Sequence, residues 1–120
     1  MEQLLHYAWK YRLYQSELKS SDGAKIEVID VGLPNTDAGP DFFNAKIKIG
    51  DKLWAGNIEI HLHSGDWIKH GHHLDKAYNS VVLHVVSKIG DPVYNQLGQP
   101  IPQCELHIPQ RLYNNYDYLV

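Results

Sequence analysis

The segment from Asn57 to His63 constrains the fold of this chain more than any other. Ile58, Ile60 and Leu62 occupy alternate positions. Glu59, His61 and His63 occupy the positions that follow them. Because a β-strand sends successive side chains to opposite faces of its sheet, this pattern predicts a strand with one apolar face and one ionisable face. Burying three ionisable groups costs free energy unless they bind a metal or ligand, or pair with one another. The segment is therefore a candidate core strand and a candidate site.

A second acid, Asp41, begins the preceding predicted strand and follows a proline whose fixed φ stiffens the chain there. Gly50-Asp51 predicts a tight turn between the two strands. With such a turn, Asp41 and Glu59 lie near the same end of the strand pair. Two carboxylates in such proximity repel each other unless a proton or a cation lies between them.

These residues favour a site for a divalent cation. Mg²⁺ or Mn²⁺ would relieve the repulsion between two carboxylates, and histidine ligands would shift the preference toward Mn²⁺, Zn²⁺ or Fe²⁺. The candidate metal ligands are Asp41, Glu59, His61 and His63. Two other interpretations stay open: Asp41 caps a turn, or the ionisable face of the strand is a solvated face of an antiparallel sheet.

Length and composition are those of a small globular protein. The 120 residues suit one core, so we expect a single domain over residues 1–120. A lone cysteine, Cys104, excludes an internal disulfide and a zinc site made of several cysteines. The sequence has no apolar run of about 20 residues and no basic start followed by an apolar stretch. We therefore expect a cytoplasmic protein that does not cross a membrane.

The formal net charge of −3 is not that of a protein that coats nucleic acid, although an acidic metal site would itself contribute negative charge. The tyrosine-rich segment Gln110–Val120 predicts the start of a helix without a polar tail. We expect this domain to be the N-terminal part of a longer protein whose remaining part contacts it. The sequence leaves the oligomeric state open.

The remaining pattern indicates a mixed sheet with a leading helix. The predicted elements are a helix over 2–18, strands over 25–31, 42–49, 52–63 and 80–87, a loop over 32–40, a loop with one or two helical turns over 66–79, a hairpin around 94–100, a strand over 103–108 and a helix from 110. The continuously apolar run 80–87 is typical of a strand buried on both faces. This order is typical of an α/β or α+β domain.

Over residues 2–87 the arrangement resembles the PD-(D/E)XK nuclease superfamily. In that superfamily a helix precedes a β-hairpin and a crossover to a further strand. The first acid follows a proline, and the next strand carries an acid, any residue and a lysine. Pro40-Asp41 matches the first element, and Glu59-Ile60-His61 matches the second with histidine in place of lysine. The resemblance implies a restriction-endonuclease-like core and metal-dependent hydrolysis of phosphodiester bonds in nucleic acid.

The resemblance also implies catalytic roles. Asp41 and Glu59 would hold the cation, and His61 would replace the lysine as water-positioning group, base or third ligand, with His63 as a further ligand. The alternative is a catalytically inactive binding or assembly module on the same fold. A third interpretation is another kind of metalloenzyme, centred on His61, His63 and the loop His70–His73.

Four motifs are similar to those of an uncharacterised bacterial domain family of larger proteins, from which no activity follows. These motifs are Gly39-Pro40-Asp41-Phe42, Trp54-x-Gly56-x-x-Glu59-x-His61, Asp66-Trp67-x-x-His70 and Leu83-His84-Val85-Val86. Because His84 stands between apolar residues of a predicted buried strand, we expect it to be a hydrogen-bonded core histidine. It becomes a neighbour of the site if its face of the sheet opens onto that site.

Overall fold

An antiparallel pair of long strands, β4 (Phe42–Ile49) and β5 (Lys52–His63), forms the centre of the fold. The computed structural model describes residues 1–14 and 17–115. Gly50 lies in the turn between the two strands with φ +57°, a left-handed conformation that glycine adopts without steric cost. Both strands and their turn confirm the prediction from side-chain alternation.

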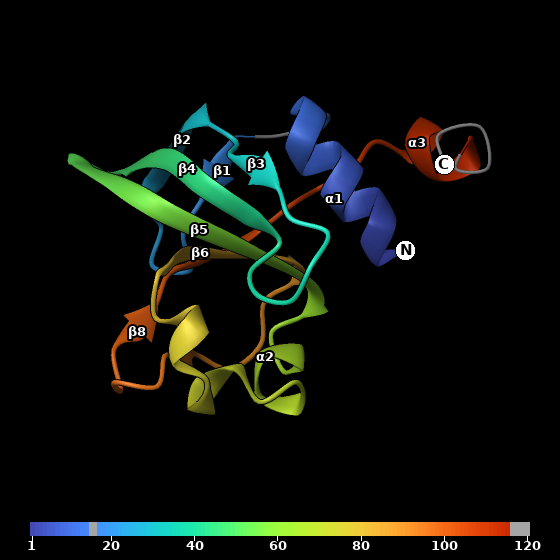
Figure 1. Ribbon diagram of the computed structural model, residues 1–120. Coiled ribbons are helices and arrows are strands. Elements are labelled where there is room, and N and C mark those ends of the chain that lie inside the picture. Colours follow the sequence, from blue (N-terminus) through green and yellow to red (C-terminus); the bar gives the residue numbers. More distant parts are fainter. Residues whose placement is uncertain (15–16, 116–120) are drawn as a thin grey trace.

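The main sheet is mixed, as predicted (Figure 1). Strands β1, β2, β4 and β5 pair antiparallel in that order, and β3 pairs antiparallel with β4. Beyond β5, β6 pairs parallel with β5, and β9 pairs parallel with β6. The bounds of the strands not given above are β1 Leu18–Lys19, β2 Lys25–Asp30, β3 Leu33–Pro34, β6 Val81–Lys88 and β9 Gln103–Glu105. A separate hairpin pairs β7 (Val93–Tyr94) with β8 (Pro100–Ile101), where the sequence predicts one.

The leading helix α1 (Glu2–Tyr11) covers one face of this sheet (Figure 1). Its buried residues join the apolar side chains of β4, β5 and β6 in the main core. The predicted helix over 2–18 is too long, because Arg12 turns left-handed with φ 57°. The Arg12 guanidinium donates to the carbonyl oxygens of Val28 and Ile29 on β2, which holds the chain in that turn. Residues 15–16 of that prediction lie outside the described residues.

The crossover from β5 to β6 covers the opposite face (Figure 1). It consists of α2 (Asp66–Lys69) and the 3₁₀ turns η1 (His72–Leu74) and η2 (Lys76–Tyr78), which confirms the predicted loop with helical turns. Trp67 is fully buried in a second apolar cluster, and its indole N–H donates to the carbonyl oxygen of Tyr94. This anchor fixes the crossover against the sheet.

The C-terminal strand is shorter than predicted. β9 ends at Glu105, and one further hydrogen bond, from Leu106 N–H to the carbonyl oxygen of Val86, continues the pairing before Pro109, which has no N–H. Helix α3 (Gln110–Asn114) follows, and residues 116–120 of the predicted helix lie outside the described residues. Among the helices of residues 1–14 and 17–115, none combines the length and apolar character that a membrane crossing needs.

Gly56 lies where β5 packs closely against the start of β6. A Cβ atom there would lie 2.6 Å from the carbonyl oxygen of Ser80 and 2.5 Å from a methyl group of Val82. We therefore expect Gly56→Ala to lower the free energy of unfolding by about 1–3 kcal/mol in urea titrations. Gly65→Ala is the control, because nothing lies within 4 Å of the position that its Cβ would take, and it should change stability by less than about 0.5 kcal/mol. Equal stability of the two variants would contradict this packing.

Candidate metal centre

The ionisable face predicted for β5 is present, and most of it is buried. Glu59 and His61 are 4% and 2% exposed, on the face opposite the isoleucine side chains of the main core. The crossover covers this face, so it is not a solvated face of the sheet. His63 lies at the exposed end of β5, and its backbone N–H donates to Oδ2 of Asp66.

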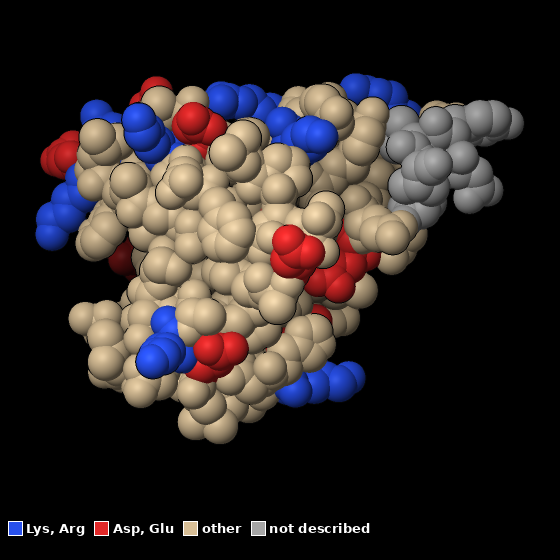
Figure 2. Space-filling model, viewed as in Figure 1, with Lys and Arg blue, Asp and Glu red and all other residues tan. Residues whose placement is uncertain are grey.

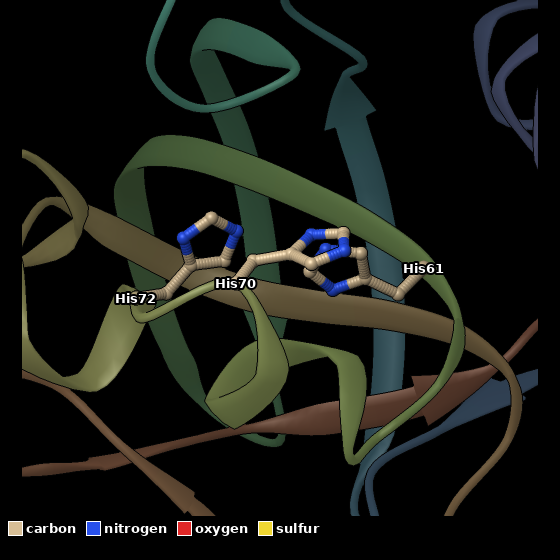
Figure 3. A group of neighbouring side chains, drawn as sticks. All are labelled: His61, His70 and His72. Atoms are coloured by element: carbon tan, nitrogen blue, oxygen red, sulfur yellow. The ribbon is translucent and has the colours of Figure 1, made fainter.

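Two histidines of the crossover lie against His61. Ligand atoms of His61, His70 and His72 all lie within 4.8 Å of one another, and Figure 3 shows the three rings gathered between β5 and the crossover. His72 stacks on the ring of Tyr78 with centroids 3.7 Å apart, and the edge of Trp67 meets it at 5.3 Å. These contacts hold the His72 ring in place, whereas His70 is exposed to solvent.

Glu59 places a carboxyl group against two of the three imidazoles. Its Oε2 lies 3.3 Å from Nε2 of His61 and 2.8 Å from Nε2 of His72. Although the Glu59 oxygen lies this close, no hydrogen bond is found for the buried Nε2 of His72 within the described part of the chain. A buried polar atom without a partner costs free energy, and a ligand would remove that cost.

The donor set fits a transition-metal ion. Three imidazole nitrogens and one carboxylate oxygen supply the four ligands of a tetrahedral Zn²⁺ site, and Mn²⁺ or Fe²⁺ accept the same donors. Ligand nitrogens of a tetrahedral zinc site lie about 3.3 Å apart. The spacing of the histidine nitrogens here is compatible with coordination after small side-chain movements. Glu59, His61, His70 and His72 would hold the ion.

Burial sets the protonation of these groups. It raises the pKa of Glu59 to about 9, and the neighbouring Asp41 carboxylate contributes to the same rise. Burial lowers the pKa of His61 to about 2 and that of His72 to about 4. At neutral pH the contacts of Glu59 with these histidines therefore join neutral groups, and the acid carries a proton. Neutral imidazoles are ready to bind a metal, but Glu59 must first release its proton.

The predicted proximity of Asp41 and Glu59 is present. The backbone N–H of Asp41 donates to Oε1 of Glu59 at 3.2 Å, and Oδ2 of Asp41 accepts from the N–H of Ile60 at 2.8 Å. His6 of α1 also faces Asp41, with Nε2 3.7 Å from Oδ2. Glu2, His6 and Asp41 form a second group whose ligand atoms lie within 4.8 Å of one another. Asp41 thus stands between α1 and Glu59.

A chain of buried polar groups lies behind His61. Nδ1 of His61 is 2.7 Å from Nε2 of His84, and Nδ1 of His84 is 2.8 Å from Oε1 of Gln103. The side-chain amide of Gln103 donates to the carbonyl oxygen of Asp91 at 3.1 Å. His84 is therefore the hydrogen-bonded core histidine that the sequence predicts, and it also adjoins the site.

The structure brings together three of the four predicted ligands, Asp41, Glu59 and His61. Glu59 is outside the two ligand groups among residues 1–14 and 17–115, but it contacts His61 and His72. His63 is outside both groups as well and lies at the exposed end of β5. His70 and His72 take its place. The sequence pattern placed them in a loop of undefined shape, and it gave no signal for Gln103 or for His6 near Asp41.

The protonated acid has a consequence for stability. The folded state keeps the Glu59 proton from its ordinary pKa of 4.5 up to about 9, whereas the unfolded chain releases it, so this group's contribution to stability falls as pH rises through that window. Glu59→Gln mimics the neutral acid. In urea titrations with chelator, we expect this variant to exceed the native protein in stability by a margin that grows from about pH 5 to about pH 9.

Glu27→Gln, which changes an exposed acid of β2, is the matched control and should follow the native pH profile. If Glu59→Gln also followed that profile, the acid would not be held protonated in the folded state.

Comparison with known proteins gives a family but no activity. No curated protein and no solved structure matches the chain. A family profile described as a protein of unknown function (DUF2851) matches residues 2–120. The chain therefore belongs to this family of unknown function.

Proposed function

We propose that this domain is a metal-dependent hydrolase that cleaves phosphodiester bonds of nucleic acid. The observation that carries the proposal is a cluster of three imidazoles, two of which lie against the buried carboxyl group of Glu59 beside Asp41. The metal ligands we propose are Glu59, His61, His70 and His72. This set differs from the one expected from sequence, because crossover histidines replace His63 and Asp41 lies next to the ligands.

The donor set favours Zn²⁺ or Mn²⁺ as the cofactor. Mg²⁺ prefers oxygen ligands and retains much of its water, whereas imidazole nitrogen suits zinc and manganese. A bound divalent ion would stabilise negative charge developing on a phosphate and make a nearby water more acidic. Asp41 would accept the proton of the attacking water, since its side chain is 23% exposed and lies beside Glu59. Exposed His70 leaves the centre open to solvent on one side.

A cavity of about 320 Å³ next to Asp41 supports a nucleic-acid substrate. Lys10 lines it and supplies a positive charge for a phosphate. Tyr7 and Tyr11 line it too, and aromatic rings of this kind stack on bases. The Lys10 ammonium lies 5.1 Å from the centre of the Tyr11 ring. The cavity thus places a cation for phosphate and aromatic rings for bases beside Asp41.

The distribution of charge favours a local contact over broad coating of a polymer. Figure 2 shows basic residues along one rim and at separate points of the face in view, with an acidic group between them and no continuous basic surface. The net charge of −3 agrees with this picture. A substrate with an accessible end or a single-stranded segment would suit the tyrosine-lined cavity.

The order of the elements also supports the proposal. The antiparallel order β2, β4, β5, followed by a crossover to the parallel strand β6, agrees with the order that the resemblance to PD-(D/E)XK nucleases implies. The crossover contains only short helical turns, and it carries the two added histidines. The proposed centre therefore combines the acid pair implied by that resemblance with histidine ligands of the crossover.

Calorimetric titration of chelator-treated protein tests the ligand set. We expect one Zn²⁺ or Mn²⁺ bound per chain and much weaker binding of Mg²⁺. His72→Ala should weaken binding by at least about tenfold, because it removes a buried ligand, and His61→Ala should do the same. His63→Ala is the matched control from the same strand and should bind like the native protein. Equal loss in all three variants would place the ion elsewhere.

Cleavage of labelled single-stranded and double-stranded oligonucleotides tests the reaction. We expect Asp41→Asn to lower the Mn²⁺- or Zn²⁺-dependent rate by at least about 100-fold, the usual effect of losing a general base, while the metal still binds. Persistent cleavage in Asp41→Asn would show that Asp41 does not accept the proton. Tight metal binding without cleavage of either probe by the native protein would support a binding or assembly module instead.

A further inference from the structure

The buried chain behind His61 has a single consistent direction of hydrogen bonding. Its three side chains, His61, His84 and Gln103, are 2%, 0% and 2% exposed. They come from the parallel strands β5, β6 and β9, whose pairing aligns His84 with Gln103. The chain ends at the carbonyl oxygen of Asp91, which can only accept a hydrogen bond.

The direction follows from that end. The amide nitrogen of Gln103 donates to Asp91, so its carbonyl oxygen faces His84. That oxygen only accepts, so Nδ1 of His84 must carry a hydrogen. His84 is buried and no carboxylate is among its hydrogen-bond partners in the described residues, which keeps its ring neutral and leaves the lone pair on Nε2. Nδ1 of His61 must then donate to that lone pair.

We propose that His84 and Gln103 are positioning residues that lock His61 in its Nδ1–H tautomer and so present the Nε2 lone pair to the metal centre. This inference rests on the proposed function for the role of the metal. Nε2 of His61 is the atom that lies 3.3 Å from Oε2 of Glu59. A hydrogen bond at the far ring nitrogen orients a metal-binding imidazole and makes it more basic as a ligand.

The opposite tautomer would disrupt the whole chain. It would set two hydrogens or two lone pairs against each other across the 2.7 Å contact of the imidazoles, or require Gln103 to rotate its amide. Rotation would remove the hydrogen bond to Asp91 and leave two acceptors facing each other. In a buried network each group depends on its neighbours, so one amide on β9 controls a ligand two strands away.

His61 then has one role in the centre, that of a metal ligand. It is a metal ligand of one fixed tautomer, and its other nitrogen leads only to a second imidazole and an amide, which cannot carry a proton away. The role of general base therefore belongs to Asp41 and not to His61, contrary to one of the expectations from sequence.

Nitrogen-15 correlation spectra of the histidine rings in metal-free protein give the first test. We expect the Nδ1–H tautomer at both His61 and His84. The Nε2–H tautomer at either residue would overturn the proposal. This test needs no metal, so it decides the tautomer even if the protein proves not to bind Zn²⁺, a result that would overturn the proposed function separately.

Two substitutions at one position give the second test. Gln103→Met removes the acceptor for Nδ1 of His84, whereas Gln103→Glu keeps an acceptor but sets a carboxylate beside that ring. The carboxylate favours a second proton on His84, whose Nε2–H would then face Nδ1 of His61 and move the His61 hydrogen to its Nε2. We expect both variants to weaken Zn²⁺ binding by about tenfold or more, and Gln103→Glu to show the Nε2–H tautomer at His61. Native affinity in Gln103→Met, or the Nδ1–H tautomer of His61 retained in Gln103→Glu, would overturn the proposal.

Discussion

The parallel pairing of β5 with β6 determines where every group of the candidate metal centre lies. Two parallel neighbours cannot be joined by a tight turn, so the chain must cross over one face of the sheet between them. Here it crosses the ionisable face of β5. The crossover therefore delivers His70 and His72 to Glu59 and His61, and it turns a face that would otherwise be wet into a buried one.

Apolar contacts on the other face of β5 and under the crossover offset the free-energy cost of burying these ionisable groups. The apolar side of β5 packs beneath α1 in the main core, and Trp67 fills a second cluster under the crossover. These apolar contacts hold a protonated acid and two neutral imidazoles where water cannot solvate their charges. The polar centre is thus poorly suited to stabilise the metal-free fold and well suited to bind a cation.

Side-chain alternation and turn chemistry predicted the central hairpin to the residue, because both signals are local. The end of the first helix was missed because Arg12 is held by carbonyl oxygens of β2, a contact that no helical periodicity reveals. The site was predicted in part for the same reason. Neighbouring strands brought Asp41 close to Glu59, whereas the position of His72 depends on stacking against Tyr78, and that of Gln103 on the pairing of β6 with β9.

The four proposed ligands all fall within residues 59–72, which has a consequence for local opening. An ion held by them would close a short loop of chain, and closing a short loop costs little conformational entropy. The bound ion would thus fasten the first half of the crossover to β5 while leaving the α1 side of the sheet to its own apolar core. Metal loading would protect backbone amides and protease-sensitive bonds of residues 64–75 far more than those of α1.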